Sequence, residues 1–499
     1  MGILSGAFGQ ILCSCEKGFR VNKMCEETGG GGQLELQSGG LSEFLTEYDD
    51  GIGSELKVDP LGMLVIWSAF GQQIFRSRVS SISNDVRNYT LNLFNHWLVR
   101  ELIEDERVVL GTALAKRYAG KQDLNFKYAC LLYLENLFVY SMLHAEAQQR
   151  SVETVGVLGI SNAGRKWHES GSNPTLLFSH ESQAQVLVRQ LLLGVSGRYK
   201  TPLVELGFFD RSYQYDLPMA KSLWAQATSL VDSTSALKKL AIQMKAHLRE
   251  LLADSRSELR RQFFEVPNTL KQALAEAFSS PVAVGRYARH FWLSVTELDQ
   301  GASGALYRAL LPMSGEQGLN AANTADLFAQ ALLQPLPAEE RIKLEHIRRL
   351  EPLLAELDLL FTLMLSEPEQ SLDDVKLRWQ AMGRDAQTLA RQAQPLVEDA
   401  PIFAVLSAAG RSRLSRFLAL AQHADVPQQV RALLAYHESL MEERGQSSWL
   451  KLNDRGQLKL HVAPRRSPTN EDRPLGSWIN PYYIPQFRSL LRGLLGGAA

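Results

Sequence analysis

The sequence predicts a mainly α-helical protein, either a multi-helix bundle or an irregular helical array, with a small β-hairpin near the C-terminus. Three observations predict this fold class. Apolar residues recur at helical spacing over most of residues 59–444. Short Pro or Gly breaks separate Ala-, Leu-, Gln- and Arg-rich segments, and two alternating runs flank a turn after residue 448. The composition, 45% hydrophobic and 21% charged, excludes collagen-like and wholly disordered classes.

Residues 1–58 are predicted to form a flexible, acidic, glycine-rich leader. Residues 1–59 hold ten acidic and four basic side chains, a net charge of −6. The cysteines at 13, 15 and 25 match no common zinc spacing. The start of the chain fits neither a myristoylation signal nor a signal peptide. The longest apolar runs, 61–71 and 128–143, are too short or too polar to span a bilayer, so we expect a cytoplasmic protein without a membrane partner.

Residues 59–150 are predicted to form an N-terminal helical domain. Asp59 followed by Pro60 is typical of a helix start, with an N-cap carboxylate and Pro in the first turn. Apolar stripes at helical spacing follow. They include Leu61, Leu64, Val65 and Ala69, then Leu91, Phe94, Leu98 and Leu102, then Tyr128, Leu131, Leu132, Phe138 and Met142.

Residues 151–218 are predicted to form a compact helix and turn module with a basic-aromatic cluster. Thr154–Ile160 is a short β-like apolar run, and Ser182–Leu193 is expected to be a helix. The cluster combines charges that attract phosphate with flat rings that can stack on bases. Its candidate contact residues for nucleic acid or a protein partner are Arg165, Lys166, Arg198, Tyr199, Lys200 and Arg211.

Residues 219–444 are predicted to form a long helical domain, in which Pro352 lies in the first turn of a helix. Residues 445–499 follow as a basic β-hairpin with a terminal helix. The hairpin strands are 449–452 and 457–462, and the turn contains Asn453, Asp454 and Gly456. Residues 444–499 hold nine basic and three acidic side chains, a net charge of +6. Further candidate contact residues here are Arg465, Arg466, Arg488 and Arg492.

Sequence motifs for catalysis are incomplete throughout the chain. Gly159–Lys166 resembles a phosphate-binding loop, but Arg165 stands where such a loop needs Lys. Ser161 sits in a near match to a nucleophile elbow, which belongs to a sheet that this chain is not expected to have. The three His-Glu-Ser triplets lack the second zinc-binding histidine, and Asp50 with Glu55 and Lys57 lies in a glycine-rich stretch rather than on a strand. We therefore assign no catalytic residue, no metal and no cofactor.

Abundant amphipathic helices without a complete catalytic motif favour a non-catalytic scaffold or interaction subunit of a multi-protein bacterial complex. Its expected partners are other protein subunits. The alternative hypothesis is a nucleic-acid-binding subunit of a bacterial DNA-processing or anti-phage defence system, using the basic-aromatic cluster and the basic tail. The net charge of −1 conceals the opposite charges of the two ends, so it says little against a polyanionic partner.

Overall fold

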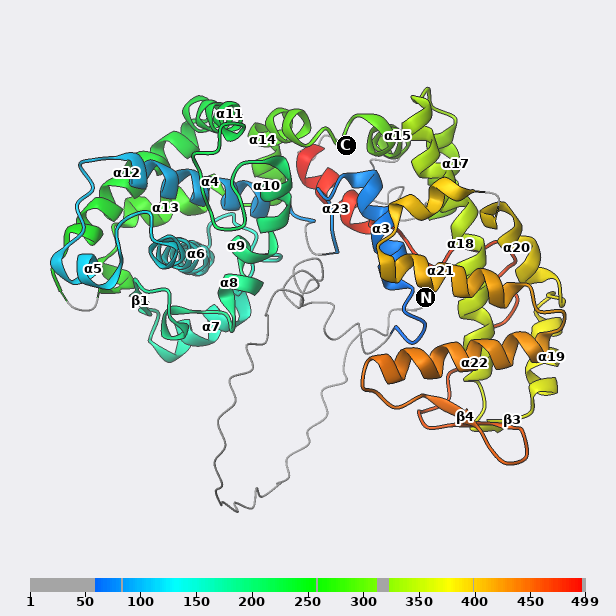
Figure 1. Ribbon diagram of the computed structural model, residues 1–499. Helices are drawn as coiled ribbons and strands as arrows, with labels where there is room; N and C mark the ends of the chain where they lie inside the picture. Colours follow the sequence, from blue (N-terminus) through cyan, green and yellow to red (C-terminus); the bar gives the residue numbers. More distant parts are fainter. Residues whose placement is uncertain (1–58, 82–83, 257–258, 312–322, 398, 496–499) are drawn as a thin grey trace, which may run out of the picture. The chain divides into compact units, whose positions relative to one another are not determined.

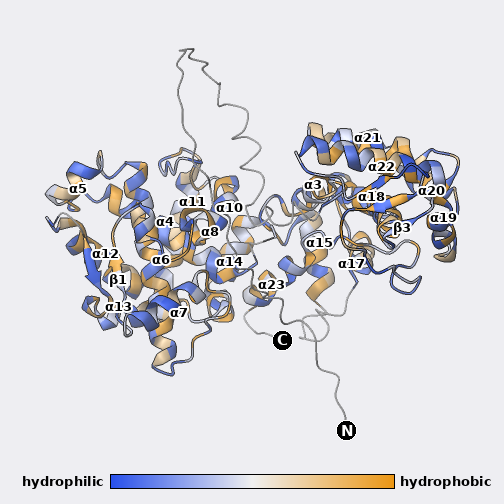
Figure 2. Cartoon of the chain, turned by 90° about the horizontal axis from the view of Figure 1, so that it is seen from below, coloured by the Kyte–Doolittle hydropathy of each residue, from blue (hydrophilic) through white to orange (hydrophobic). Residues whose placement is uncertain are grey.

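The computed structural model describes residues 59–81, 84–256, 259–311, 323–397 and 399–495. The predicted leader, residues 1–58, lies outside the described residues. The mainly α-helical fold class is confirmed, and strands form only small antiparallel groups among the described residues (Figure 1). Most helices carry both hydrophilic and hydrophobic stretches, as amphipathic helices do (Figure 2).

The first half of the described chain runs from α3 to α14. The helices are α3 (Leu64–Phe75), α4 (Val86–Glu104), α5 (Thr112–Arg117), α6 (Leu124–Ala147), α7 (Ile160–Glu169), α8 (Gln190–Leu193), α9 (Val195–Arg198), α10 (Lys200–Leu206), α11 (Ala220–Ser233), α12 (Ser235–Ala253), α13 (Asn268–Ala277) and α14 (Pro281–Thr296). The strands β1 (Thr175–Leu177) and β2 (Arg260–Gln262) and the 3-10 turns η1 (Ser182–Ala184) and η2 (Phe263–Glu265) lie among them.

The second half runs from α15 to α23. The helices are α15 (Gly301–Leu310), α17 (Thr324–Leu332), α18 (Ala338–Met364), α19 (Leu372–Ala381), α20 (Thr388–Val397), α21 (Ala408–Ala421), α22 (Val426–Glu443) and α23 (Ile484–Leu495). The strands are β3 (Glu369–Gln370), β4 (Leu450–Leu452) and β5 (Leu458–Leu460), with one 3-10 segment, η4 (Ala400–Val405).

Helices α4 and α6 lie at the centre of the first half. α6 packs against α4, α7 and α13, and α4 is also in contact with α9, α11, α12, α14 and α23 (Figure 1). Nearly every side chain of α4 is therefore buried, polar ones included. A helix covered on all sides needs no polar stripe, and the buried polar side chains must find partners inside the protein.

Helix α18 is the central helix of the second half. It is in contact with α3, α15, α17, α19, α20 and α22 (Figure 1). The prediction that a helix begins at Pro352 is wrong, because this proline lies inside the 27-residue α18. A proline inside a helix removes one backbone hydrogen bond. Neighbouring helices bury Leu353 and Leu354 completely, and this packing stabilises α18 despite the lost hydrogen bond.

The first described helix begins later than predicted. α3 starts at Leu64 rather than at Pro60, but the Asp59 carboxylate still accepts hydrogen bonds from the backbone N–H groups of Met63 (2.9 Å) and Leu64 (3.2 Å). Asp59 thus performs the predicted capping chemistry from a turn that precedes the helix.

The predicted C-terminal hairpin is confirmed. β4 and β5 are antiparallel, with Leu450 opposite Leu460, and β3 from far upstream adds a third strand beside β5. Two predictions for residues 151–218 are wrong. Thr154–Ile160 forms turns and the start of α7 instead of a strand, and Ser182–Leu193 is divided between η1 and the short α8. The domain boundaries stay a prediction, and the pairing of β1 with β2 crosses the boundary at 218/219.

Candidate interaction surfaces

The Gly159–Trp167 segment forms the start of helix α7 rather than a phosphate-binding loop. Gly159 precedes the helix with φ of +81°, and Trp167 is buried. Lys166 donates a hydrogen bond from Nζ to the backbone carbonyl of Gln185 (2.9 Å), whereas Arg165 and Ser161 are exposed. The lysine thus connects α7 to the following segment, and Arg165 alone of this basic pair projects from the surface.

The aromatic residues of the predicted cluster are core residues. Tyr199 is 1% exposed, and its hydroxyl and its backbone carbonyl accept hydrogen bonds from Asn88 and Asn92 of α4. Tyr213 and Tyr215 are buried as well. These rings are therefore not exposed for stacking on bases. The strong apolar and aromatic content of 199–215 reflects packing against α4 and α6.

The cations of the same cluster divide into internal and exposed ones. Lys200 Nζ lies 4.3 Å from the centre of the Tyr213 ring and donates to the Arg211 carbonyl (2.6 Å). Arg198, at the end of α9, is half-buried, while the Arg211 side chain is exposed. The structure therefore leaves Arg165 and Arg211 as the exposed cations of this cluster.

A buried polar network lies beneath the cluster. His96 Nδ1 is 2.8 Å from the Tyr215 hydroxyl, and Lys127, fully buried, donates from Nζ to the Tyr213 carbonyl (2.8 Å). Burial lowers the pKa of His96 to about 3, and Lys200 contributes in the same direction. A neutral histidine that water does not reach fixes the positions of α4 and the 209–215 segment, and it offers no proton to a substrate at the surface.

Glu135 of α6 lies beside a small internal cavity. Its carboxylate accepts hydrogen bonds from the Ser196 backbone N–H (2.6 Å) and from Gln190 Nε2 (3.1 Å). Burial raises the pKa of Glu135 above its usual value. The cavity next to it, lined also by Gly159 and Val186, has a volume of about 10 Å³. Such a volume holds about one water molecule, so the carboxylate does not face a substrate cleft.

The candidate residues of the basic tail lie in different surroundings. The Arg465 guanidinium lies 5.1 Å from the Trp449 ring centre, and its backbone N–H donates to the Leu365 carbonyl. Arg466 is exposed. Arg473, which sequence reasoning did not select, forms an ion pair with Asp358 of α18 (3.0 Å). On α23, Arg488 is half-buried and Arg492 is exposed.

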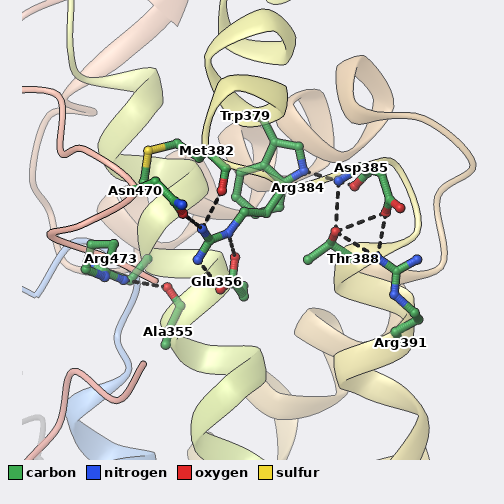
Figure 3. Close-up of polar contacts among 11 residues, drawn as sticks. Ala355, Glu356, Trp379, Met382, Arg384, Asp385, Thr388, Arg391, Asn470 and Arg473 are labelled. Carbon is green, nitrogen blue, oxygen red and sulfur yellow. Dashed lines mark hydrogen bonds and ion pairs between the residues drawn. The ribbon is translucent and has the colours of Figure 1, made fainter. Parts of the chain in front are cut away.

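Two buried carboxylates of α18 join this helix to distant segments. Glu356 forms a two-pronged ion pair with Arg384 (2.8 and 2.9 Å), and Arg384 also donates to the Met382 carbonyl and to Asn470 Oδ1 (Figure 3). Glu351 accepts four hydrogen bonds, from Trp67 Nε1, the Tyr482 hydroxyl and the backbone N–H groups of Ile479 and Asn480. Burial raises the pKa of Glu351 to about 7, although the four hydrogen-bond donors lower it.

A cationic surface on α14, α15 and α23 combines the predicted candidates Arg488 and Arg492 with basic residues that the sequence analysis did not select. These three helices contain no Asp or Glu. We name this region the α14–α15–α23 basic surface, defined by Arg286, Arg289, His290, Arg308, Arg488 and Arg492. The spacing of its residues on α14 was visible in the sequence, but the contact between α14 and α23 was not.

The helices of this basic surface are held together by direct contacts. α14 and α23 pack against each other (Figure 1). They cross at Gly285 and Gly493, so closely that a Cβ on Gly285 would lie 1.8 Å from the Gly493 carbonyl oxygen. Arg289 of α14 donates to the Tyr307 hydroxyl of α15 (3.3 Å). The side chains of Arg286, His290, Arg308 and Arg492 are exposed.

The described residues contain no group of three or more His, Cys, Asp or Glu side chains placed to hold a metal ion. Asp50, Glu55 and Lys57 lie outside the described part of the chain. None of the described helices combines the length and the apolar character needed to cross a bilayer. Comparisons with family models, with curated proteins and with solved structures each find no match to this chain.

Proposed function

We propose that this protein is a non-catalytic helical scaffold, an interaction subunit of a multi-protein bacterial complex in the cytoplasm. One observation carries the proposal: the buried carboxylates Glu135, Glu351 and Glu356 accept hydrogen bonds from neighbouring segments. A catalytic acid or base must come within hydrogen-bond reach of its substrate. These carboxylates instead join segments of the fold, which is the chemistry of a rigid framework.

Exposed apolar side chains on well-formed helices supply anchors for a protein partner. Ile242 on α12 is 64% exposed beside a shallow depression of about 500 Å³ that Asp232 and Lys238 also line. Leu377 on α19 is 62% exposed. A buried apolar anchor with a polar rim is the usual core of a protein–protein interface. At the depression on α11 and α12, Ile242 would be the apolar anchor and the surrounding polar and charged side chains the rim.

The proposal is tested by purifying the full-length, tagged protein from its native host under gentle conditions. Its mass in solution and the identity of the bound subunits are then measured by light scattering and mass spectrometry. A scaffold subunit gives a complex of fixed stoichiometry. A lone monomer at the protein's natural concentration would contradict the proposal.

A pair of matched variants locates the docking surface. Ile242→Asp and Leu377→Asp introduce the same charge at equally exposed helix positions, so both should fold. We expect Ile242→Asp to lower the recovery of the partner at least tenfold and Leu377→Asp to leave it unchanged. If Leu377→Asp lowers the recovery and Ile242→Asp does not, the docking surface lies on α19 rather than on α12.

A nucleic-acid-binding subunit of a bacterial DNA-processing or anti-phage defence system is the second candidate function. The α14–α15–α23 basic surface favours it, because phosphate contacts require clustered cations. The exposed Arg165 and Arg211 of the 151–218 module are a second, smaller source of positive charge.

A further inference from the structure

We propose that the α14–α15–α23 basic surface binds the phosphate backbone of nucleic acid. This inference rests on the second candidate function above, nucleic-acid binding, and assigns that binding to one surface. It is independent of the proposed protein partner, since it depends on different residues and a different chemistry. Its support comes from the distribution of charge, from the geometry of the helices and from the kind of side chains that are exposed.

The charge of this surface is not balanced by acidic residues on its own helices. Elsewhere arginines pair with carboxylates, as Arg100 does with Glu104 and Arg249 with Asp105. On the basic surface the partners of Arg289 and Arg308 are uncharged, namely the Tyr307 hydroxyl and the Asp299 backbone carbonyl. A neutral acceptor orients a guanidinium without cancelling its charge, so the positive potential remains available to an anion.

The acidic residues nearest in sequence lie in the connection between α14 and α15. Glu297 forms an ion pair with Arg76. Asp299 has a buried Oδ1 atom. Neither Glu297 nor Asp299 lies on the three helices, and the charge of Glu297 is already paired with Arg76 at the end of α3. Asp299 offsets at most one charge of the five arginines on the three helices, so the helices keep a net positive charge.

The cations lie at spacings that suit successive phosphates. Arg286, Arg289 and His290 occupy positions i, i+3 and i+4 of α14, and Arg488 and Arg492 occupy positions i and i+4 of α23. Residues so spaced lie on one side of a helix, with Cβ atoms about 5–6 Å apart. Helices α14 and α23 therefore each present a short row of positively charged side chains.

The glycine crossing brings the two rows near each other. Gly285 and Gly493 are in direct contact, and their chain neighbours are Arg286 and Arg492. From standard backbone dimensions, the Cα atoms of these two arginines lie within about 13 Å. Two extended arginine side chains can contact phosphates of one backbone segment across that distance.

The exposed side chains favour nucleic acid over an acidic protein partner. Among the described residues, none of the strongly exposed large apolar side chains lies on α14, α15 or α23. Protein interfaces depend on buried apolar or aromatic anchors, whereas phosphate binding needs charge and hydrogen-bond donors only. A surface with arginines and without apolar anchors fits the second chemistry. Arginine also binds phosphate with two parallel hydrogen bonds.

The test measures binding of the full-length protein to a fluorescently labelled 25-base-pair DNA duplex by anisotropy. We expect micromolar binding at 50 mM salt and a slope near −4 for the logarithm of the association constant against the logarithm of the salt concentration. The affinity should then fall roughly 250-fold between 50 and 200 mM salt. Absence of binding at 50 mM salt would overturn the proposal.

Charge-reversal variants assign the binding to this surface. Arg286→Glu should weaken binding at least tenfold and make the salt slope shallower by about 1 or more. The matched control is Arg455→Glu in the exposed turn between β4 and β5, which changes the net charge equally. Equal losses in both variants would overturn the proposal. His290→Glu, at a second exposed position of α14, repeats the test if Arg286→Glu alters the circular dichroism spectrum.

A competition experiment distinguishes nucleic acid from an acidic protein partner. Unlabelled duplex should displace the labelled duplex, and polyglutamate at the same concentration of negative charge should displace it at least tenfold less effectively. Equal displacement by polyglutamate would assign the surface to acidic proteins and overturn the proposal. A monomer that binds duplex through Arg286 would contradict the scaffold function and leave this inference intact.

Discussion

Glu351 connects three segments that are far apart in sequence. One carboxylate oxygen accepts from Trp67 of α3 and Tyr482, and the other accepts from the backbone of Ile479 and Asn480. Four donors partly replace the water that the carboxylate loses on burial. Burial still dominates, since it raises the pKa to about 7 from the usual 4.5.

This raised pKa makes stability depend on pH. Between pH 4.5 and pH 7 the unfolded carboxyl group releases its proton while the folded one retains it. The folded state then binds more protons, so the free energy of unfolding falls as pH rises through this window, by roughly 3 kcal/mol from Glu351 alone. We expect the difference in unfolding free energy between wild type and Glu351→Gln to show this slope below pH 7 and a plateau above it. Urea denaturation from pH 4.5 to pH 8.5 measures the difference, and a pH-independent difference would contradict the assignment.

Gly285 is required by the close approach of α14 and α23. Because a methyl group on Gly285 would overlap the Gly493 carbonyl, Gly285→Ala must push the helices apart, at a cost of about 1–3 kcal/mol. Gly164 of α7 is the matched control, since no atom beyond its chain neighbours and the adjacent backbone of its own helix lies within 4 Å of its Cβ position. Gly164→Ala should stabilise the protein by about 0.5–1 kcal/mol through helix propensity. Thermal unfolding of both variants checks this, and a neutral Gly285→Ala would show that the crossing is looser than described.

At the scale of elements, the Glu356–Arg384 pair attaches the connection between α19 and α20 to α18 (Figure 3). Both side chains are almost completely buried. Arg384→Met leaves the Glu356 charge buried without its partner, which should cost about 3–5 kcal/mol. The double variant Glu356→Met/Arg384→Met removes both charges and should be more stable than the Arg384→Met single variant. A double-mutant cycle by chemical denaturation measures this coupling, and strict additivity would mean that the two charges do not interact.

Local signals account for the elements that the sequence predicted correctly. The hairpin of β4 and β5 follows from the Asn453–Gly456 turn, where Asn453 Oδ1 accepts hydrogen bonds from the backbone of Arg455 and Gln457. Most helices follow from apolar periodicity within one segment. The third strand, β3, was not predicted because its partner β5 lies about 90 residues away in sequence.

The sequence-based predictions that were wrong concern segments whose structure depends on contacts between residues far apart in the sequence. The strand predicted at Thr154–Ile160 is absent, while β1 exists by pairing with β2, more than 80 residues further along the chain. The basic-aromatic cluster looked like a binding surface because sequence alone does not separate a buried Tyr199 from an exposed one. The basic surface as a whole was missed because its rows on α14 and α23 come together through the packing of two helices that lie about 200 residues apart in sequence.

At the scale of the whole described chain, α23 and the segment before it connect early and late helices. α23 is in contact with α4 and α14, and Phe487 lies 4.8 Å from the Phe75 ring of α3. Just upstream, the Tyr483 hydroxyl is 2.9 Å from Ser68 Oγ, and Tyr482 donates to Glu351. One short segment therefore stabilises helices from both halves of the sequence, which should couple their stability.

This coupling is tested at Phe487, which is completely buried. Phe487→Ala removes the ring between α23 and α3 and should cost about 3–5 kcal/mol. The matched control is Phe264→Ala, whose ring is 67% exposed and should matter by less than about 0.5 kcal/mol. Because α23 packs on α14 and contacts α3 through Phe487, we expect faster hydrogen exchange in peptides from both of these helices, and little change in α19. Faster exchange confined to residues 484–495 would show that α23 is only a peripheral helix. Faster exchange in both α3 and α14 would show that α23 couples the stability of helices that are far apart in the sequence.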